Sequence, residues 1–262
     1  MKKIKLVAIL YFSILIKIFG QDIKGVIVFK EFEYHDTIGM VESNREGTLL
    51  INITQSSSIY ITGKKLNNLK SENIYEKKEN GVIVGRNANP GSKKGITLYK
   101  SLRTKMLSYQ GNAFGIPYIV SDKYPEISWS ILDSIKSIKG LICQKAEGDF
   151  RGRHYIAWFI NKISISDGPW KLCGLPGLIL EAYDEKKHFI FEAQSIDFPK
   201  EFKESITPPT DGQSIDFFSY FKLEEKEIEE LPKRIAAKFA ENGGTVNSLK
   251  LCHNSIERNI SE

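Results

Sequence analysis

The feature that most constrains the fold is the segment from residue 151 to residue 160, where side-chain character alternates with a period of two. Successive residues of an extended chain point to opposite faces of a sheet, so this period predicts a β-strand. One face would carry His154, Ile156, Trp158 and Ile160, and the other Arg153, Tyr155, Ala157 and Phe159. A strand that is apolar on both faces is covered on both sides. The segment therefore predicts a β-rich fold with this strand inside it.

Shorter apolar runs, separated by residues typical of turns, occur along most of the chain. Their lengths suit strands and are too short for helices. They predict a mainly β fold (β-rich α+β) with a curved antiparallel sheet, a half-barrel in one version, and a helix packed on it. The runs lie at residues 23–34, 48–54, 58–63, 82–84, 96–99, 106–110, 118–120, 127–131, 137–146, 178–180 and 188–198.

The single helix is predicted near the C-terminus, over residues 223–242. Pro232 lies inside this stretch, and because proline lacks a backbone N–H, we expect a kink or two short helices. Packing on the sheet and binding to a partner are both open as roles for this segment. Its apolar stripe has helical spacing: Ile228, Leu231, Ile235 and Phe239.

The first twenty residues have the features of a secretory signal peptide. A lysine-rich start precedes an apolar run at residues 6–16, and the small residue Gly20 suits a cleavage site. This run is short for a membrane span, which needs about 20 residues. The sequence therefore predicts a signal peptide at 1–20 and a single domain at 21–262, located in the periplasm, outside the cell or at the outer membrane. No transmembrane span is expected after cleavage.

Removal of the signal peptide would also remove most of the net charge. The chain has 37 Lys and Arg against 32 Asp and Glu, a formal charge of +5, and four of the lysines lie in residues 1–20 with no acidic residue. A nearly neutral chain lacks the basic surface of a nucleic-acid-binding protein. We therefore expect no nucleic-acid partner.

No residue pattern identifies a catalytic or metal site. A nucleophile elbow and a His-Glu-x-x-His motif are both missing from the sequence. Glu181, Asp184 and Glu185 form an acidic cluster, which is either a solvated turn or, less favoured, a set of acid–base carboxylates. His154 is predicted to be a core histidine. We expect no cofactor and no metal, because the histidines lack the spacing of metal ligands: His35, His154, His188 and His253.

A turn-rich segment from Gly168 to Glu181 follows the strand at 151–160. Glycine next to proline is a turn signal, and a glycine that follows proline accepts the positive φ of a type II turn. We therefore expect Gly177, which follows Pro176, to have a positive φ. Two interpretations stay open: the glycines and prolines only shape the backbone, or Trp170 and its apolar neighbours form the rim of a binding pocket.

Five motifs occur in order between residues 125 and 198: Trp129, Cys143-Gln144-Lys145-Ala146, Gly152-Arg153-His154-Tyr155-Ile156-Ala157-Trp158, Gly168-Pro169-Trp170-Lys171 and Gly174-Leu175-Pro176-Gly177-Leu178-Ile179. This order resembles the GLPGLI family of Bacteroidetes envelope proteins, which is named after the last hexapeptide. The resemblance implies secretion into the envelope and a β-rich domain, and it carries no catalytic assignment. The signature residues that are candidates for binding are Trp129, Arg153, Tyr155, Trp158, Gly168, Pro169, Trp170, Gly174, Leu175, Pro176, Gly177, Leu178 and Ile179.

The sequence contains three cysteines, Cys143, Cys173 and Cys252. A disulfide is plausible in an exported protein. We favour a bond between Cys143 and Cys173, because both lie in the signature region. Three buried free thiols are the alternative.

The function predicted is that of a non-enzymatic exported envelope protein of binding, assembly or carrier type. Its partner would be another envelope protein, a peptide or a lipid-like ligand. The alternative is an envelope hydrolase with a carboxylate-based site. A large apolar cavity would favour the first function, and convergent carboxylates in a polar cleft would favour the second.

Overall fold

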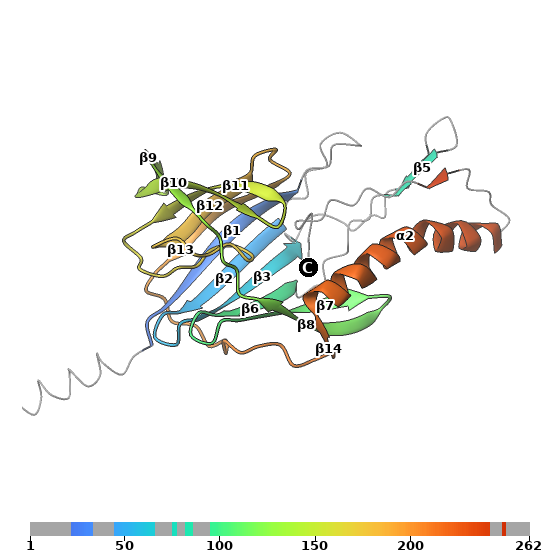
Figure 1. Ribbon diagram of the computed structural model, residues 1–262, viewed down its shortest axis with the longest axis horizontal. Coiled ribbons are helices and arrows are strands. Elements are labelled where there is room, and N and C mark those ends of the chain that lie inside the picture. The colour runs from blue at the N-terminus through green and yellow to red at the C-terminus, as the bar shows by residue number, and fades with distance from the viewer. Residues whose placement is uncertain are drawn as a thin grey trace, which may run out of the picture.

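The computed structural model describes residues 22–33, 45–65, 75–77, 82–85, 95–241 and 248–249. The predicted signal peptide at 1–20 lies outside the described residues, as does Cys252, and predictions about them stay predictions. Most of the described residues belong to one large sheet and one helix (Figure 1).

The predicted mainly β fold is confirmed, because twelve strands form one continuous sheet. All neighbouring strands in it are antiparallel except β14 and β8. The large sheet contains β1 (Lys24–Glu33), β2 (Arg45–Asn52), β3 (Ser57–Lys65), β6 (Ile96–Ser101), β7 (Met106–Ala113), β8 (Ile116–Lys123), β9 (Ser130–Ile138), β10 (Leu141–Phe150), β11 (Arg153–Ile160), β12 (Leu178–Asp184), β13 (Phe189–Asp197) and β14 (Gln213–Asp216). A small second sheet contains β4 (Tyr75–Lys77), β5 (Val82–Gly85) and β15 (Ser248–Leu249).

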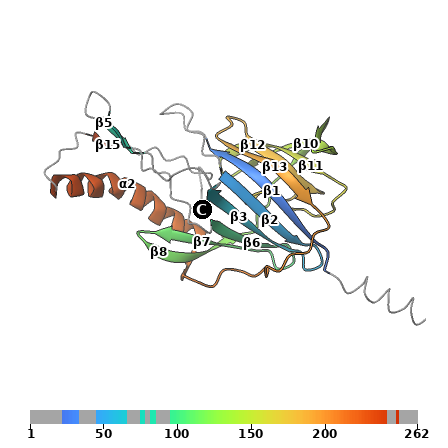
Figure 2. The same cartoon turned by 180° about the vertical axis from the view of Figure 1, so that it is seen from behind.

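The connection from β8 to β9 explains why the large sheet is curved. The strand order is β14-β8-β7-β6-β3-β2-β1-β13-β12-β11-β10-β9, which places β8 and β9 ten positions apart. In a flat sheet this separation would be roughly 48 Å, because neighbouring strands are about 4.8 Å apart. The chain from Lys123 to Ser130 reaches at most about 25 Å when fully extended. The sheet must therefore bend, as both views of the ribbon show (Figures 1 and 2).

The inner face of the sheet carries the hydrophobic core. Directly opposed residues of neighbouring strands lie on the same face. One inner row contains only buried side chains, and runs across Ile27, Leu49, Tyr60, Leu98, Tyr109 and Val120. The adjacent inner row includes three polar residues, and runs across Ile51, Ser58, Lys100, Leu107 and Asp122. Polar side chains in a core face need partners. Those of Lys100 and Asp122 find their partners in the turn-rich segment from Gly168 to Glu181.

The predicted C-terminal helix is confirmed as α2 (Phe217–Glu241), which begins six residues earlier than expected. It begins there because Asp216 accepts a hydrogen bond from the Ser219 backbone N–H at 3.0 Å, as an N-cap residue does. Hydrogen bonds from the side chain of Ser219 and from its backbone N–H hold the pKa of Asp216 below its usual value. The expectation of two short helices is wrong, since one helix continues through Pro232, and the kink stays a prediction.

The N-terminal part of α2 packs on the sheet. Tyr220 is buried, and its hydroxyl accepts a hydrogen bond from the Asn112 N–H of β7 at 3.0 Å. Arg234 still lies 5.9 Å from the ring centre of Phe114 in the β7–β8 turn, and the last turns of the helix extend away from the large sheet (Figure 1). It therefore does not cover the sheet as a lid would.

Among the residues described, no helix has both the length and the apolar character needed to cross a membrane.

Candidate functional site

The chain between β11 and β12 is an irregular loop, residues 161–177, which contains the motif at 168–171 and most of the hexapeptide at 174–179. We call it the signature loop. Asp167 forms a parallel bridge with Leu178, and its carbonyl accepts a hydrogen bond from the Ile179 N–H at 2.9 Å. The Gly174 N–H donates to Ser166 Oγ at 2.9 Å. These bonds fold the loop back onto the start of β12, and they give it an ordered backbone.

Lys100 connects this loop to β6 on the other half of the sheet. Its Nζ forms an ion pair with Asp167 and donates hydrogen bonds to the carbonyl oxygens of Gly168 at 2.8 Å and Trp170 at 2.9 Å. A lysine ammonium has three N–H donors, so these three acceptors account for all of them. Lys100 is 2 % exposed. This Lys100 clamp therefore holds the loop and leaves no donor for a ligand.

Asp122, at the end of β8, makes a second connection. Its Oδ2 accepts a hydrogen bond from Lys171 Nζ at 2.8 Å, and its Oδ1 accepts one from Arg151 at 2.7 Å. Lys171 is fully buried, and its Nζ also lies 4.3 Å from the ring centre of Phe217 in α2. This Asp122 clamp joins β8, the β10–β11 turn and the signature loop around one carboxylate. Loop, helix and both halves of the sheet meet there.

The three tryptophans of the signature region do not form one group. Trp129 donates its indole N–H to the Cys173 carbonyl at 2.8 Å, which holds the loop from the β9 side. Trp170 packs against Tyr109 of β7, with ring centres 5.8 Å apart. Trp158 instead shares the outer face with Lys136, whose Nζ lies 4.4 Å from its ring centre. The first two therefore support the loop, and Trp158 does not.

Two signature glycines are needed for different physical reasons. Gly174 has a φ of 99°, in the left-handed region that favours glycine. The positive φ expected for Gly177 is wrong, because Gly177 is not among the described glycines with positive φ. A Cβ at Gly177 would lie 2.2 Å from the Ile160 carbonyl oxygen. Gly177 therefore allows the loop backbone to approach β11 closely.

Arg153 and Asp184 form a buried cluster with His188 on the inner side of the β12–β13 hairpin. Arg153 donates to Asp184 Oδ2 at 3.0 Å, and His188 Nδ1 lies 3.3 Å from the same oxygen. Asp184 Oδ1 accepts the Phe189 backbone N–H at 2.7 Å. The cluster fixes the hairpin. The core histidine is therefore His188, whereas His154 lies on the outer face beside Asp149 at 2.9 Å.

The acidic cluster predicted after the signature is divided between environments. Glu181 pairs with Lys136 on the outer face at 2.6 Å, and Glu185 is exposed. Asp184 is buried, so the prediction of a solvated turn is wrong for this residue. Side chains an odd number of positions apart in a strand point to opposite faces. Glu181 and Asp184 therefore do not converge on one site.

Cys143 and Cys173 are both free thiols in the structure, which does not contain the predicted disulfide. The reason is their location: Cys143 lies on β10 near Lys136, whereas Cys173 lies in the loop against the Pro125 carbonyl. Burial raises the pKa of each thiol from 9.0 to about 11. Both thiols are therefore protonated at neutral pH.

The remaining candidate residues are mostly core residues. Tyr155, Leu175, Leu178 and Ile179 are buried, as are Gly168 and Pro169, whereas Pro176 is exposed. The sequence interpretation missed Lys100, Asp122, Arg151 and Asp167. One signal for Lys100 was available, since it follows Leu98 by two residues and so lies on the apolar face of its strand. The partners of these residues depend on tertiary contacts and carried no local signal.

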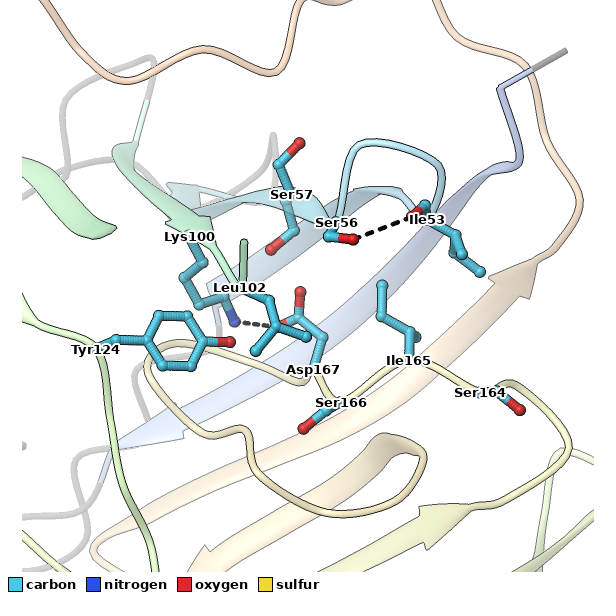
Figure 3. Close-up of a pocket in the computed structure, with 11 residues that line it drawn as sticks. Ile53, Ser56, Ser57, Lys100, Leu102, Tyr124, Ser164, Ile165, Ser166 and Asp167 are labelled. Carbon is cyan, nitrogen blue, oxygen red and sulfur yellow. Dashed lines mark hydrogen bonds and ion pairs between the residues drawn. The ribbon is translucent and has the colours of Figure 1, made fainter. Parts of the chain in front are cut away.

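A small pocket lies beside the Lys100 clamp (Figure 3). Its volume is about 90 Å³, below the roughly 300 Å³ at which pockets for drug-sized ligands begin. Its rim comes from the β2–β3 turn, the β6–β7 turn and the signature loop. It is lined by Ile53, Ser56, Ser57, Ser58, Lys100, Leu102, Tyr124, Ser164, Ile165, Ser166 and Asp167.

No cluster of three or more His, Cys, Asp or Glu side chains in the described part of the chain has an arrangement that could hold a metal ion. The loop residues Asp167 and Lys171 are instead paired with Lys100 and Asp122 of the sheet. These ion pairs fix the backbone of the signature loop against two distant regions of the sheet.

One family model matches part of the chain. Residues 144–181 match the family described as "Protein of unknown function (Porph_ging)". This match spans most of β10, all of β11 and the loop, and most of β12, and it does not confirm the GLPGLI name. A comparison with the curated proteins finds no significant match.

Among the similar solved structures are two of PNGF-II. The first, in space group P21, has a TM-score of 0.52 and 14 % identity and covers 78 % of this chain. The second, in space group C2, has a TM-score of 0.50, 14 % identity and the same coverage. This chain covers only 34 % and 33 % of those chains, about a third of their length. At this identity the likeness supports the mainly β fold alone.

Proposed function

We propose that this protein is an exported, non-enzymatic component of the bacterial envelope that binds or assembles with another envelope protein. We further propose that it is a member of the GLPGLI family, in the periplasm, outside the cell or at the outer membrane. The sequence of residues 1–20 and the hexapeptide at 174–179 support export and membership, respectively.

The observation that carries the proposal is the use of the signature charges within the fold. Lys100, Asp167, Lys171 and Asp122 are each matched to an opposite charge in a buried pair. Groups committed in this way hold a backbone and are poorly placed to react with a substrate. The Lys100 and Asp122 clamps therefore fix the signature loop against the curved sheet, and the two together form a rigid scaffold.

The described surface favours a protein partner over a lipid-like ligand. The pocket beside the clamp is small, with a volume of about 90 Å³, and it has no room for an acyl chain. Exposed isoleucines occur instead at the edge formed by β9 and β10, where Ile131, Ile135 and Ile142 are 46 %, 67 % and 64 % exposed. Exposed apolar side chains grouped on an edge mark a protein-binding surface.

The test is recovery of a partner from an envelope extract with the mature protein as bait. The recovered protein would then be purified, and its Kd measured by calorimetry. The double variant Ile135→Ser/Ile142→Ser should weaken this Kd at least tenfold. Ile116→Ser, at an exposed position of β8, is the matched control and should not change it. Equal affinity for all three proteins, or steady turnover of an envelope polymer by the purified protein, would refute the proposal.

A further inference from the structure

The pocket beside the Lys100 clamp contains an unmatched polar group. Ser58 is 1 % exposed, and its Oγ has no hydrogen-bond partner among the described residues. A buried hydroxyl without a partner is costly, so it calls for a group that the protein itself does not supply. Because Ser58 is paired with Lys100 across β3 and β6, both side chains lie on the inner face. Ser58 therefore lies beside Lys100 at the buried end of the pocket.

The pocket offers no free charge. The Lys100 ammonium and the Asp167 carboxylate neutralise each other, and the three donors of Lys100 are already used. A charged ligand would lose its hydration without gaining a counter-ion, which is unfavourable. The occupant that fits is therefore neutral.

The other polar groups are hydroxyls, which both donate and accept hydrogen bonds. Ser56, Ser164 and Ser166 line the pocket, and Ile165 and Leu102 add apolar side chains to its wall (Figure 3). Tyr124 forms another wall, and burial raises the pKa of its phenol well above the usual value, so it stays neutral. Hydroxyls set among apolar carbons match the edge of a sugar or polyol, which has the same two kinds of surface.

We infer that this pocket binds a neutral hydroxyl-bearing group, such as one edge of a terminal sugar or a small polyol, with Ser58 Oγ as a buried contact. The volume of about 90 Å³ admits one such group and no more. The inference rests on the proposed binding function, and it adds a ligand chemistry and a location to it.

The experiment is a titration of the mature protein, observed by ¹H–¹⁵N NMR. The neutral probes are glycerol and methyl α-glucoside, and the charged probes are acetate and methylammonium. The neutral probes should shift the amide signals of Ser58, Ser166 and Asp167, and the charged probes should leave them unchanged. Shifts with acetate that exceed those with the neutral probes, or no shift with any probe, would overturn the inference.

Two serine variants identify the contact. Ser58→Ala should weaken binding of the neutral probe about three- to tenfold, as loss of one neutral hydrogen bond does. Ser108 is the matched control, because its Oγ is also buried without a partner in the described chain but does not line the pocket. Equal losses in Ser58→Ala and Ser108→Ala, or none in either, would contradict the assignment. If the probe fails to bind while the envelope partner still binds with the same Kd, only the pocket inference falls.

Discussion

Both faces of the sheet carry lysine–carboxylate ion pairs, but the pairs on the inner face are buried and those on the outer face are partly exposed. On the inner face, Lys100 and Lys171 are 2 % and 0 % exposed, and each contacts a buried carboxylate. On the outer face, Lys136 approaches Glu181 at 2.6 Å, yet its side chain is 33 % exposed. Water can replace the partner of Lys136, whereas only the protein can stabilise the charges of Lys100 and Lys171.

The difference shows which charges determine the structure. A buried pair is costly to break, because removal of one partner leaves the other charged and dry. An exposed pair contributes about 0–1 kcal/mol. The signature loop depends on the first kind and the outer surface on the second. The signature loop is therefore held in place by the two buried clamps, and Gly177 separately allows its backbone to approach β11 closely.

The largest expected effect comes from Asp122→Asn, which removes the carboxylate shared by Lys171 and Arg151. The substitution leaves a fully buried ammonium without its counter-ion, and we expect a loss of about 3–5 kcal/mol in the free energy of unfolding. Urea denaturation followed by circular dichroism measures it. Asp133→Asn, at an exposed position of β9, is the control, and an equal effect in the two variants would remove the distinction between buried and exposed charges.

A smaller loss is expected from Gly177→Ala. The added Cβ would approach the Ile160 carbonyl oxygen to 2.2 Å, and overpacking of this kind costs about 1–3 kcal/mol. Because the problem is space and not backbone φ, Gly177→Asn should be no milder than Gly177→Ala. Thermal unfolding tests this order. If Gly177→Asn is clearly the more stable variant, then the left-handed backbone interpretation was correct after all.

Alkaline pH should lower the free energy of unfolding through the two buried thiols. The pKa values of Cys143 and Cys173 rise from 9.0 to about 11 on folding, so the unfolded chain loses these protons first. Their contribution to stability is therefore complete below pH 9 and falls as pH rises toward 11. Urea midpoints of the Cys252→Ser protein and of the Cys143→Ser/Cys173→Ser/Cys252→Ser protein, compared from pH 8 to 11, measure the difference. Parallel curves would mean that the two thiols titrate normally.

The smallest effect is expected from Lys136→Met, which breaks the pair with Glu181 on the outer face. Because both side chains are partly solvated, we expect a change of about 0–1 kcal/mol, decreasing further in high salt. The same urea assay provides the value. A loss as large as that of Asp122→Asn would show that the outer pair also holds the fold.

Much of the fold could be predicted because strand periodicity is local. The strand at 151–160 and the hairpin after the signature are both present, at β11 and at β12 with β13. The helix was also placed, and its start was missed only because Asp216 was not recognised as its cap. Patterns that repeat every two or four residues are visible without any tertiary contact.

The clamps could not be predicted, because their partners are distant in sequence. Lys100 and Asp167 are 67 residues apart, and Asp122 and Lys171 are 49 apart. Lys171 follows a tryptophan in a turn-rich motif, which is typical of a surface residue. It is buried only because the sheet is curved. The prediction of a solvated turn is wrong for Asp184 for the same reason. Its sequence neighbours are polar, yet its spatial neighbours are Arg153 and His188.

The central claim, that the signature loop is a clamped part of the scaffold, is tested most directly by hydrogen–deuterium exchange of the wild-type protein. The amides of Leu172 and Ile179 donate to the carbonyls of Pro169 and Asp167. They should exchange as slowly as the amides of the central strand β1, while the amides of Arg103 and Lys105 in the exposed β6–β7 turn exchange quickly. Exchange of Leu172 and Ile179 as fast as that of Arg103 and Lys105 would contradict the clamp.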